Sequence, residues 1–326
     1  PEGGARILHS VDGLPVERLA ELHSELFAPL RAAAHGFLDS LRLALPEGPR
    51  SGDWKAVGSG LDGRRNNQIL GAISYGANNR LVHELYALVM ARCGAMSNGG
   101  EGGVPDHIRA LFVTARLVAR GGGVRALERQ LAEEVPNYLK GLGSDERAAL
   151  CRRLIRTVPE DFAASRFEQI STARFGVDAY AFHDARFLEI KIGQGAKPGV
   201  GGSLPGEKVV PRIAATRGVN EGQTLNSPTV HHDIYSIEDL RQLVTALKIF
   251  NPEARVCVKL AAMDDLDIVA LGVAKAGADF IWIDGYEGGT GSAKDAHKEH
   301  CGLPAAPVLR RVQETLVAEG LRGGYR

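Results

Sequence analysis

Residues 187–206, FLEIKIGQGAKPGVGGSLPG, constrain the fold of this chain more than any other segment. A β-branched apolar run ends at Lys191, and the segment as a whole contains six glycines and two prolines. Neither a helix nor a strand accommodates GAKPGVGG, so this part must be an irregular loop. A buried strand that delivers a glycine-rich, lysine-bearing loop is typical of α/β enzymes that bind anionic ligands. The alternative is a flexible surface connection, which the position of the lysines at the strand end and inside the loop disfavours.

The composition limits the classes of function. A chain of 326 residues can form one large core, as a single α/β barrel or as two smaller domains. Lys plus Arg equals Asp plus Glu at 39 each, so no global charge attracts nucleic acid or an anionic membrane. No apolar run predicts a membrane span or an export signal. The cysteines Cys93, Cys151, Cys257 and Cys301 form no C-x-x-C pair, so we expect reduced thiols of a cytoplasmic protein and no metal site.

The chain is predicted to have four parts. Residues 1–66 form an N-terminal helical extension, and 67–104 begin a barrel. Residues 105–165 form an insertion of three or four helices, because apolar side chains recur there at i, i+3 and i+4. Residues 166–326 continue the barrel.

Strands and helices alternate in the barrel part. Strands are predicted over 68–74, 95–98, 187–193, 223–226, 255–260 and 279–284. Helices are predicted over 81–93, 207–217, 236–249, 264–276 and 304–320, with Ser236 and Asp239 capping the third of these. This alternation favours a parallel sheet in an α/β fold. Six strands are predicted in this chain, whereas a closed (β/α)8 barrel of the TIM type needs eight. We therefore expect about six of the eight strands here, within a longer or processed polypeptide.

Four further polar or glycine-rich segments follow or end predicted strands. They are GAISYG at 71–76, SNGGEGG at 97–103, SPTVHHDIYS at 227–236 and DGYEGGTG at 284–291. Barrels of this type build their sites at the C-terminal ends of strands, so these segments predict one shared site. Lys259 lies within an apolar strand, and a buried ammonium needs a partner, so we expect it to point toward a ligand.

Simpler interpretations exist for these segments. SNGGEGG fits a plain turn. The neighbouring His231 and His232 suggest zinc, but adjacent side chains on an extended segment point in opposite directions, which favours packing of one imidazole over a metal site. DGYEGGTG lacks the G-K-[ST] ending of a P-loop, so a phosphate or a flat ring close to the glycine backbone is favoured over a nucleoside triphosphate.

Several long stretches resemble the FMN-binding synthase domain of glutamate synthase. They are GAISYG, GAMSNGGEGG, SRFEQISTARFGV, LEIKIGQGAKPGVGGSLPGEKV, HHDIYSIEDL, VCVKLAA, GVAKAGAD, IDGYEGGTG and HCGLPAA, in the family's order within 68–104 and 165–326. The resemblance implies a (β/α)8 barrel that holds FMN and a three-iron cluster. It also implies reduction of the 2-imino acid, formed from 2-oxoglutarate and ammonia, to L-glutamate.

The same resemblance implies a role for individual residues. The residues expected to bind FMN are Ser74, Tyr75, Gly76, Asn98, Lys259, Gly288, Gly289 and Thr290. The residues expected to bind the 2-oxo acid are Lys191, Gln194, Arg217 and Ser203. Two carboxylates need cations, and Arg can hold one with two hydrogen bonds. Lys197 and Glu101 are expected to be catalytic, because imine formation requires a proton donor and acceptor beside the carbonyl carbon.

The sequence departs from the family pattern at several points. Val200 replaces an acidic residue and Ser203 replaces Gln, which removes polar groups from the loop that faces the oxo acid. The block 105–165 is longer than its counterpart and is expected to act as a lid or a docking surface. The chain ends where the seventh strand is expected, and the cluster cysteines are not among its four, so an iron–sulfur cluster is expected only in a longer chain.

The expected partners follow from these departures. Without an N-terminal glutaminase domain, ammonia arrives free or from a separate glutaminase subunit, and an electron-donor subunit is a further expected partner. We expect an oligomer that binds neither nucleic acid nor membrane. Two alternatives remain: an enzyme of the same fold acting on another 2-oxo acid or imine, and a flavin-free scaffold or regulatory subunit. The lysines and arginines of the predicted site disfavour the scaffold.

Overall fold

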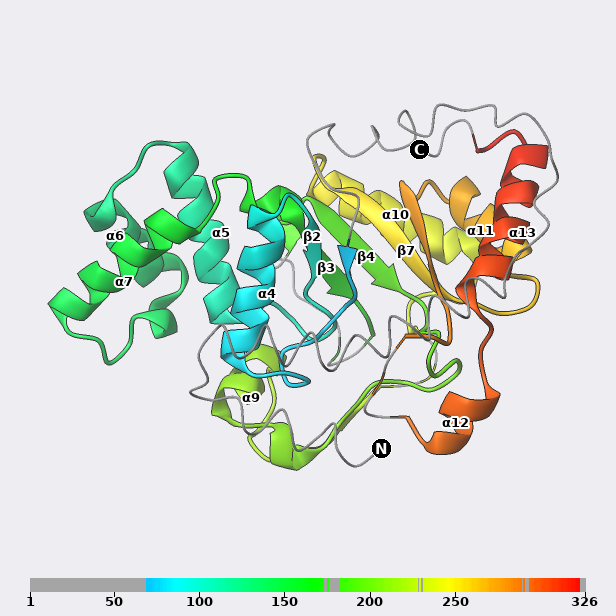
Figure 1. Cartoon of the computed structure of the whole chain (residues 1–326), viewed down its shortest axis with the longest axis horizontal. Helices are drawn as coiled ribbons and strands as arrows, with labels where there is room; N and C mark the ends of the chain where they lie inside the picture. The colour runs from blue at the N-terminus through cyan, green and yellow to red at the C-terminus, as the bar shows by residue number, and fades with distance from the viewer. Residues whose placement is uncertain are drawn as a thin grey trace, which may run out of the picture. The chain divides into compact units, whose positions relative to one another are not determined.

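Six parallel strands form one curled sheet in the structure, a computed structural model (Figure 1). The structure describes residues 69–172, 175, 182–227, 229, 231–288, 290 and 293–322. The strands are β1 (Ile69–Leu70), β2 (Met96–Asn98), β3 (Arg166–Ile170), β4 (Phe187–Lys191), β7 (Arg255–Ala261) and β8 (Phe280–Asp284), adjacent in that order. All five pairings are parallel. The predicted fold class, a TIM-barrel type of α/β fold with six strands in this chain, is confirmed.

Helices cover the convex face of the sheet (Figure 1). They are α4 (Arg80–Arg92), α10 (Ile237–Phe250), α11 (Leu266–Lys275) and α13 (Ala305–Ala318). Alternate strand residues such as Leu188, Ile190 and Val258 are buried in the same apolar cluster as residues of α10, α11 and α13. The predicted capping box of α10 is present, because Ser236 Oγ accepts from the Asp239 N–H at 3.2 Å.

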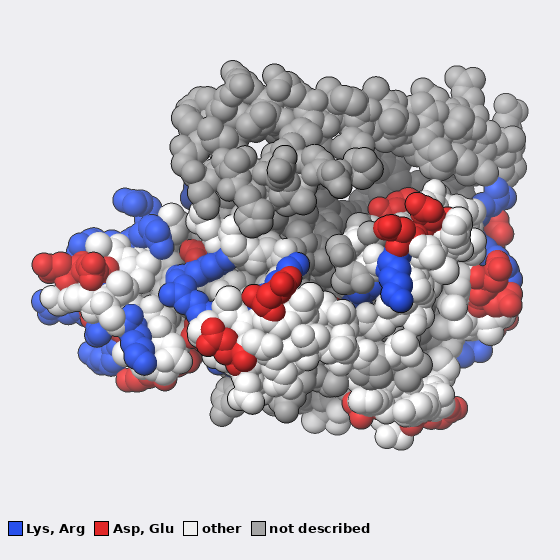
Figure 2. Space-filling model, turned by 90° about the horizontal axis from the view of Figure 1, so that it is seen from below, with Lys and Arg blue, Asp and Glu red and all other residues white. Residues whose placement is uncertain are grey.

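Three helices and two short 3-10 turns follow β2. They are α5 (Asp106–Ala119), α6 (Val124–Glu134) and α7 (Ser144–Thr157), with the turns at Pro136–Tyr138 and Phe162–Ser165. Their apolar faces form a separate core that includes Leu111, Leu127 and Leu154. Figure 2 shows Lys, Arg, Asp and Glu side chains gathered on the outer face of this end of the molecule, as expected for helices that are amphipathic.

Two strand predictions were wrong. The segment 223–226 does not join the sheet: β6 (Leu225–Asn226) pairs antiparallel with β5 (Ser203–Leu204) in a small hairpin beside the rim. The sheet strand that takes its place, β3, was missed, because three of its five residues are strongly polar although all five are buried. The number of sheet strands was right, but their identity was not.

Smaller differences concern the ends of elements. The predicted strand 68–74 is only β1, and the chain after it is irregular. The predicted helix 207–217 is a 3-10 turn, Gly206–Lys208, followed by α9 (Pro211–Arg217), because Pro211 favours the first turn of a helix. A short helix that was not predicted, α12, spans Asp295–His300. The N-terminal extension 1–66 and Gly289 lie outside the described residues. No helix in the described residues is long and apolar enough to cross a membrane.

Candidate functional site at the rim of the sheet

The concave face of the sheet changes from apolar to polar toward the C-terminal ends of the strands. Its lower layer is apolar and includes Met96, Phe167, Phe187 and Cys257. Two positions further along the strands, the same face carries Asn98, Gln169, Glu189, Lys259 and Asp284. Side chains alternate between the two faces of a strand, so residues two apart share this face. The sheet therefore presents a polar floor beneath the loops of the rim.

Polar side chains of the floor pair between β3 and β4 and between β7 and β8. Gln169 Nε2 donates to Glu189 Oε1 at 2.5 Å. Lys259 Nζ lies 3.1 Å from Asp284 Oδ2, which also accepts from the Gly195 N–H at 2.9 Å. Burial raises the pKa of Glu189, whereas the nearby Lys259 lowers it. Lys259 is thus buried with a carboxylate partner, which the sequence prediction required but did not name.

The loops above this floor bring predicted substrate and catalytic residues into contact. Lys191 Nζ donates to Glu101 Oε2 at 2.7 Å and lies 3.5 Å from Gln194 Oε1. Lys191 ends β4, Gln194 follows it in the glycine-rich loop, and Glu101 comes from the loop after β2. The side chains of Lys191 and Glu101 are only 11% and 14% exposed. A carboxylate in this position balances one cation of the rim.

Two further buried cations surround Glu101. Lys197 is buried, its Nζ lies 3.3 Å from the Gly201 carbonyl oxygen, and burial together with Lys191 lowers its pKa against the opposing effect of Glu101. Arg217, at the end of α9, is buried with its guanidinium 4.9 Å from the centre of the Phe175 ring. Burial lowers its pKa too, and Glu101 opposes this. Among the described residues, Lys191, Lys197 and Arg217 thus share the influence of the Glu101 carboxylate.

Close backbone approaches explain the glycines of the loop after β2. A Cβ on Gly100 would lie 2.4 Å from the Ser74 backbone nitrogen, and Gly100 has a φ of +69°. A Cβ on Gly102, whose φ is +106°, would lie 1.9 Å from Arg217 Cζ. The loop after β2 thus packs against both the loop after β1 and the Arg217 guanidinium, which confirms close backbone contact there and excludes a plain surface turn.

Predicted FMN-binding residues lie in these same loops. Asn98 is buried, its Oδ1 accepts from the Gly100 N–H at 2.9 Å, and its side chain also acts as a hydrogen-bonding group on Glu189. Tyr75 is buried and precedes Gly76. Gly288 lies beside Asp284, since a Cβ there would be 3.5 Å from Asp284 Oδ1. Thr290 follows in the same turn. Their roles toward FMN remain predictions.

Two predicted features lie apart from this cluster. Ser203 is exposed on the hairpin, and its Oγ donates to Asn226 Oδ1 at 2.9 Å. His231 is buried, whereas its neighbour His232 is exposed, as expected for opposite orientations. Among the described residues, no cluster of three or more His, Cys, Asp or Glu is suited to hold a metal ion.

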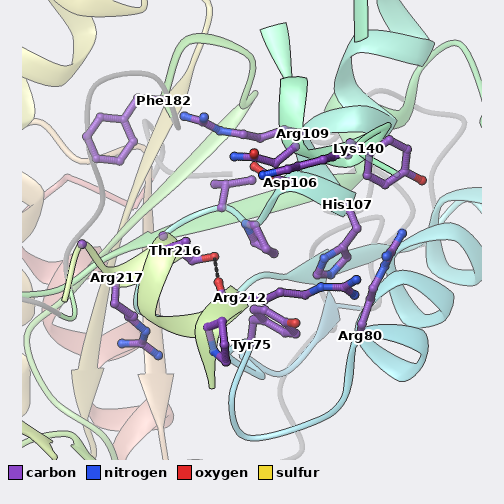
Figure 3. Close-up of a pocket in the computed structure, with 18 of the residues that line it drawn as sticks. Tyr75, Arg80, Asp106, His107, Arg109, Lys140, Phe182, Arg212, Thr216 and Arg217 are labelled. Carbon is purple, nitrogen blue, oxygen red and sulfur yellow. Dashed lines mark hydrogen bonds between the residues drawn. The ribbon is translucent and has the colours of Figure 1, made fainter. Parts of the chain in front are cut away.

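A cavity of about 1620 Å³ lies next to the rim and is lined by residues of α5, α7 and α9 (Figure 3). Arg80 and Arg212 flank His107 on its wall, with Tyr75 beside them. Of the predicted site residues that the structure describes, only Tyr75 and Arg217 line this cavity. The cavity therefore adjoins the cluster of lysines but does not contain it.

The structure also contains buried polar groups that the sequence prediction missed. Arg166 Nε donates to Glu168 Oε1 at 2.9 Å, both side chains being almost fully buried next to Gly99. His83 and His107 form a second buried pair, 3.0 Å apart between ring nitrogens. The first pair could have been found in the sequence, because Arg166 and Glu168 lie next to apolar residues in a short strand. The contact between α4 and α5 leaves no comparable signal in the sequence.

Comparisons with known proteins show which family this chain is similar to. Residues 65–324 match the family described as "Conserved region in glutamate synthase". The ferredoxin-dependent glutamate synthase of Antithamnion sp. is 42% identical over 252 residues, and chloroplastic ferredoxin-dependent glutamate synthase 2 of Arabidopsis thaliana is 43% identical over the same length. The large chain of glutamate synthase [NADPH] of Bacillus subtilis (strain 168) is 38% identical over 252 residues.

These matches cover 77% of this chain but only 14% or 15% of each relative, so the chain spans a small part of their length. The family match nevertheless includes every described strand of the sheet and every described residue of the rim. The chain belongs to the glutamate synthase family.

Proposed function

We propose that the rim binds FMN and a dianionic 2-oxo acid, and that it serves in an FMN-dependent oxidoreductase that converts 2-oxoglutarate and ammonia, through the 2-imino acid, to L-glutamate. The observation that carries the proposal is the convergence of Lys191, Lys197 and Arg217 around Glu101. Buried cations are costly unless they are paired, and the Glu101 carboxylate acts on all three of these. A substrate with two carboxylates would bring further negative charge to the same cations.

The residues present also fit FMN. The buried Asn98 amide, between the Gly100 backbone and Glu189, would offer a hydrogen bond to a flavin carbonyl or ring nitrogen. Lys259 lies on the same concave face and would stabilise negative charge on the reduced ring. The Gly100 and Ser74 backbones are in close contact, and no side chain fits between them. When bound, FMN supplies hydride transfer, and this chain supplies position and charge.

The protein groups divide the remaining tasks. Lys191 and Arg217 would hold the carboxylates of the oxo acid, Arg217 through its planar guanidinium. The lowered pKa of Lys197 makes its ammonium a stronger acid, so it would donate a proton to the oxo oxygen. Glu101 would accept a proton from the attacking ammonia, since its carboxylate lies at the rim beside the residues proposed to hold the oxo acid.

The names of the relatives suggest which partner proteins this chain has. Some are ferredoxin-dependent and another is the large chain of an NADPH enzyme, so we propose a protein electron donor for this chain as well. Ammonia would come from a glutaminase or from solution. An iron–sulfur cluster belongs to the proposal only as part of a longer polypeptide.

A second candidate is the same chemistry on another 2-oxo acid or imine. It is favoured by the loop after β4, where Val200 contributes no polar group and Ser203 bonds to Asn226 on the exposed hairpin. Fewer polar contacts in this loop would suit a substrate with a less polar side chain.

Anaerobic reoxidation of the reduced, FMN-loaded protein tests the proposal. The proposal predicts rapid reoxidation by 2-oxoglutarate plus ammonium, and slow reoxidation by either alone. Rapid reoxidation only by a different 2-oxo acid with ammonium would favour the second candidate. A protein that takes up no FMN would contradict both and favour a scaffold or regulatory subunit.

A further inference from the structure

A buried pair of histidines connects the helices after β2 to the loops of the rim. His83 lies on α4 and His107 on α5, and both side chains are at most 4% exposed. His83 Nδ1 lies 3.0 Å from His107 Nε2, and His83 Nε2 lies 3.5 Å from the Gly99 carbonyl oxygen. The imidazole of His83 thus bridges α5 and the loop that follows β2.

The loop after β1 joins the same cluster. The Tyr75 ring lies 5.0 Å from the His107 ring, edge to face, and 5.9 Å from the His83 ring. The backbone of Ile73 acts on the His83 imidazole as a hydrogen-bonding group. The two loops that carry Ser74, Tyr75, Asn98 and Glu101 therefore contact one imidazole pair.

We propose that His83 and His107 are positioning residues, which hold the loops after β1 and β2 in the arrangement that binds the flavin ring and that places Glu101. The proposal rests on the proposed function for the identity of the ligand. It gives α5 a role other than a lid or a docking surface: the helix supplies the outer half of the pair that supports the site.

The hydrogen-bond pattern has one consistent direction. If His83 Nε2–H donates to the Gly99 carbonyl, its Nδ1 is an acceptor, and His107 Nε2–H must donate to it. Both rings are then neutral, each in a single tautomer. Burial, with Arg166 and the other nearby arginines, lowers the pKa of His83 to about 3 and that of His107 to about 2. The pair therefore keeps this pattern throughout the physiological pH range.

The test compares variants that remove the hydrogen bonds with one that retains them. His83→Leu and His107→Leu remove them, whereas the amide nitrogen of His107→Gln can still donate to His83. The exposed His183, whose side chain is 76% exposed, gives the matched control His183→Leu. Hydrogen exchange of the amides of residues 97–103 is measured first, because it does not depend on a bound flavin. The dissociation constant and absorption spectrum of FMN are measured second.

We expect faster exchange in the loop 97–103 and roughly tenfold weaker FMN binding in both leucine variants, a change that corresponds to about 1.4 kcal/mol. His107→Gln and His183→Leu should match the wild type. Unchanged hydrogen exchange of residues 97–103 in the leucine variants would overturn the proposal. Leucine variants that are less stable but bind FMN with wild-type affinity would overturn it as well. If the wild type binds no FMN, the proposed function fails, and exchange alone decides whether the pair holds the loops.

Discussion

The Nζ of Lys191 lies 2.7 Å from Oε2 of Glu101, although 90 residues separate them in the chain. This ion pair joins the end of β4 to the loop after β2 and balances part of the positive charge of the rim. In Glu101→Gln, Lys191, Lys197 and Arg217 would lose their shared carboxylate. We expect the free energy of unfolding to fall by about 3 kcal/mol, the lower end of the range for a partner removed from a buried pair.

The substrate should offset this loss. A 2-oxo dicarboxylate restores negative charge at the rim, so 2-oxoglutarate should raise the melting temperature of Glu101→Gln more than that of the wild type. Thermal unfolding with and without 2-oxoglutarate measures this difference. An equal increase in both proteins would show that the dicarboxylate does not bind beside Glu101.

Lys197→Met should abolish turnover and leave FMN bound. The substitution keeps most of the side-chain volume but removes the ammonium that would donate a proton to the oxo oxygen. Because the group is buried and does not belong to the predicted flavin-binding residues, the FMN dissociation constant should stay within about twofold, less than about 0.5 kcal/mol. Steady-state kinetics and a flavin titration are compared. Turnover at the wild-type rate would remove Lys197 from the catalytic residues.

Gly102→Ala should impair substrate binding because it displaces the Arg217 guanidinium. A Cβ at this position would lie 1.9 Å from Arg217 Cζ. We expect KM for the oxo acid to rise at least about tenfold, as for the loss of a charged hydrogen bond. Gly141→Ala is the matched control, since Gly141 also has a positive φ, +84°, but its Cβ would meet no atom within 4 Å. Equal effects on KM in the two variants would indicate backbone strain alone.

Acid should destabilise the protein through the buried histidines. Their pKa values are about 3 and about 2 in the folded state, below the ordinary histidine value of 6.5, so the unfolded chain binds more protons below pH 6.5. Stability is then lost as the pH falls, by about 2 kcal/mol for the pair between pH 7 and 5.5.

Urea unfolding of the wild type and of His83→Leu/His107→Leu at both pH values tests this effect. Glu168 and Glu189, whose pKa values are raised by burial, act in the opposite direction but are the same in both proteins. The double variant should therefore lose less stability on acidification. A parallel loss in both proteins would show that the histidines do not contribute.

The part of the site that could be predicted from the sequence is the part that local patterns determine. A glycine-rich segment cannot continue a strand, so the loop after Lys191 and its position at a strand end followed directly from residue types. Lys259 within an apolar strand indicated an inward, paired cation, and the structure shows Asp284 as its partner.

The missed features depend on contacts between distant residues. Strand β3 contains Arg166 and Glu168, whose burial is stable only because each neutralises the other. The segment 223–226 was assigned to the sheet, but it pairs with Ser203–Leu204, which no local pattern indicates. The contact of His83 with His107 arises from the packing of α5 on α4. Residue types alone do not determine which polar side chains, distant in the sequence, form hydrogen bonds or ion pairs with each other.

Titration of FMN into the wild type and into Lys259→Met is the most direct test of whether the rim binds FMN beside Lys259. Quenching of flavin fluorescence reports binding without any need for turnover. We expect saturation at one FMN per chain in the wild type, and affinity at least about tenfold weaker in the variant, because the ammonium proposed to stabilise the ring is lost and Asp284 no longer has this cationic partner. Absence of saturable binding in the wild type, or equal affinity in the two proteins, would contradict it.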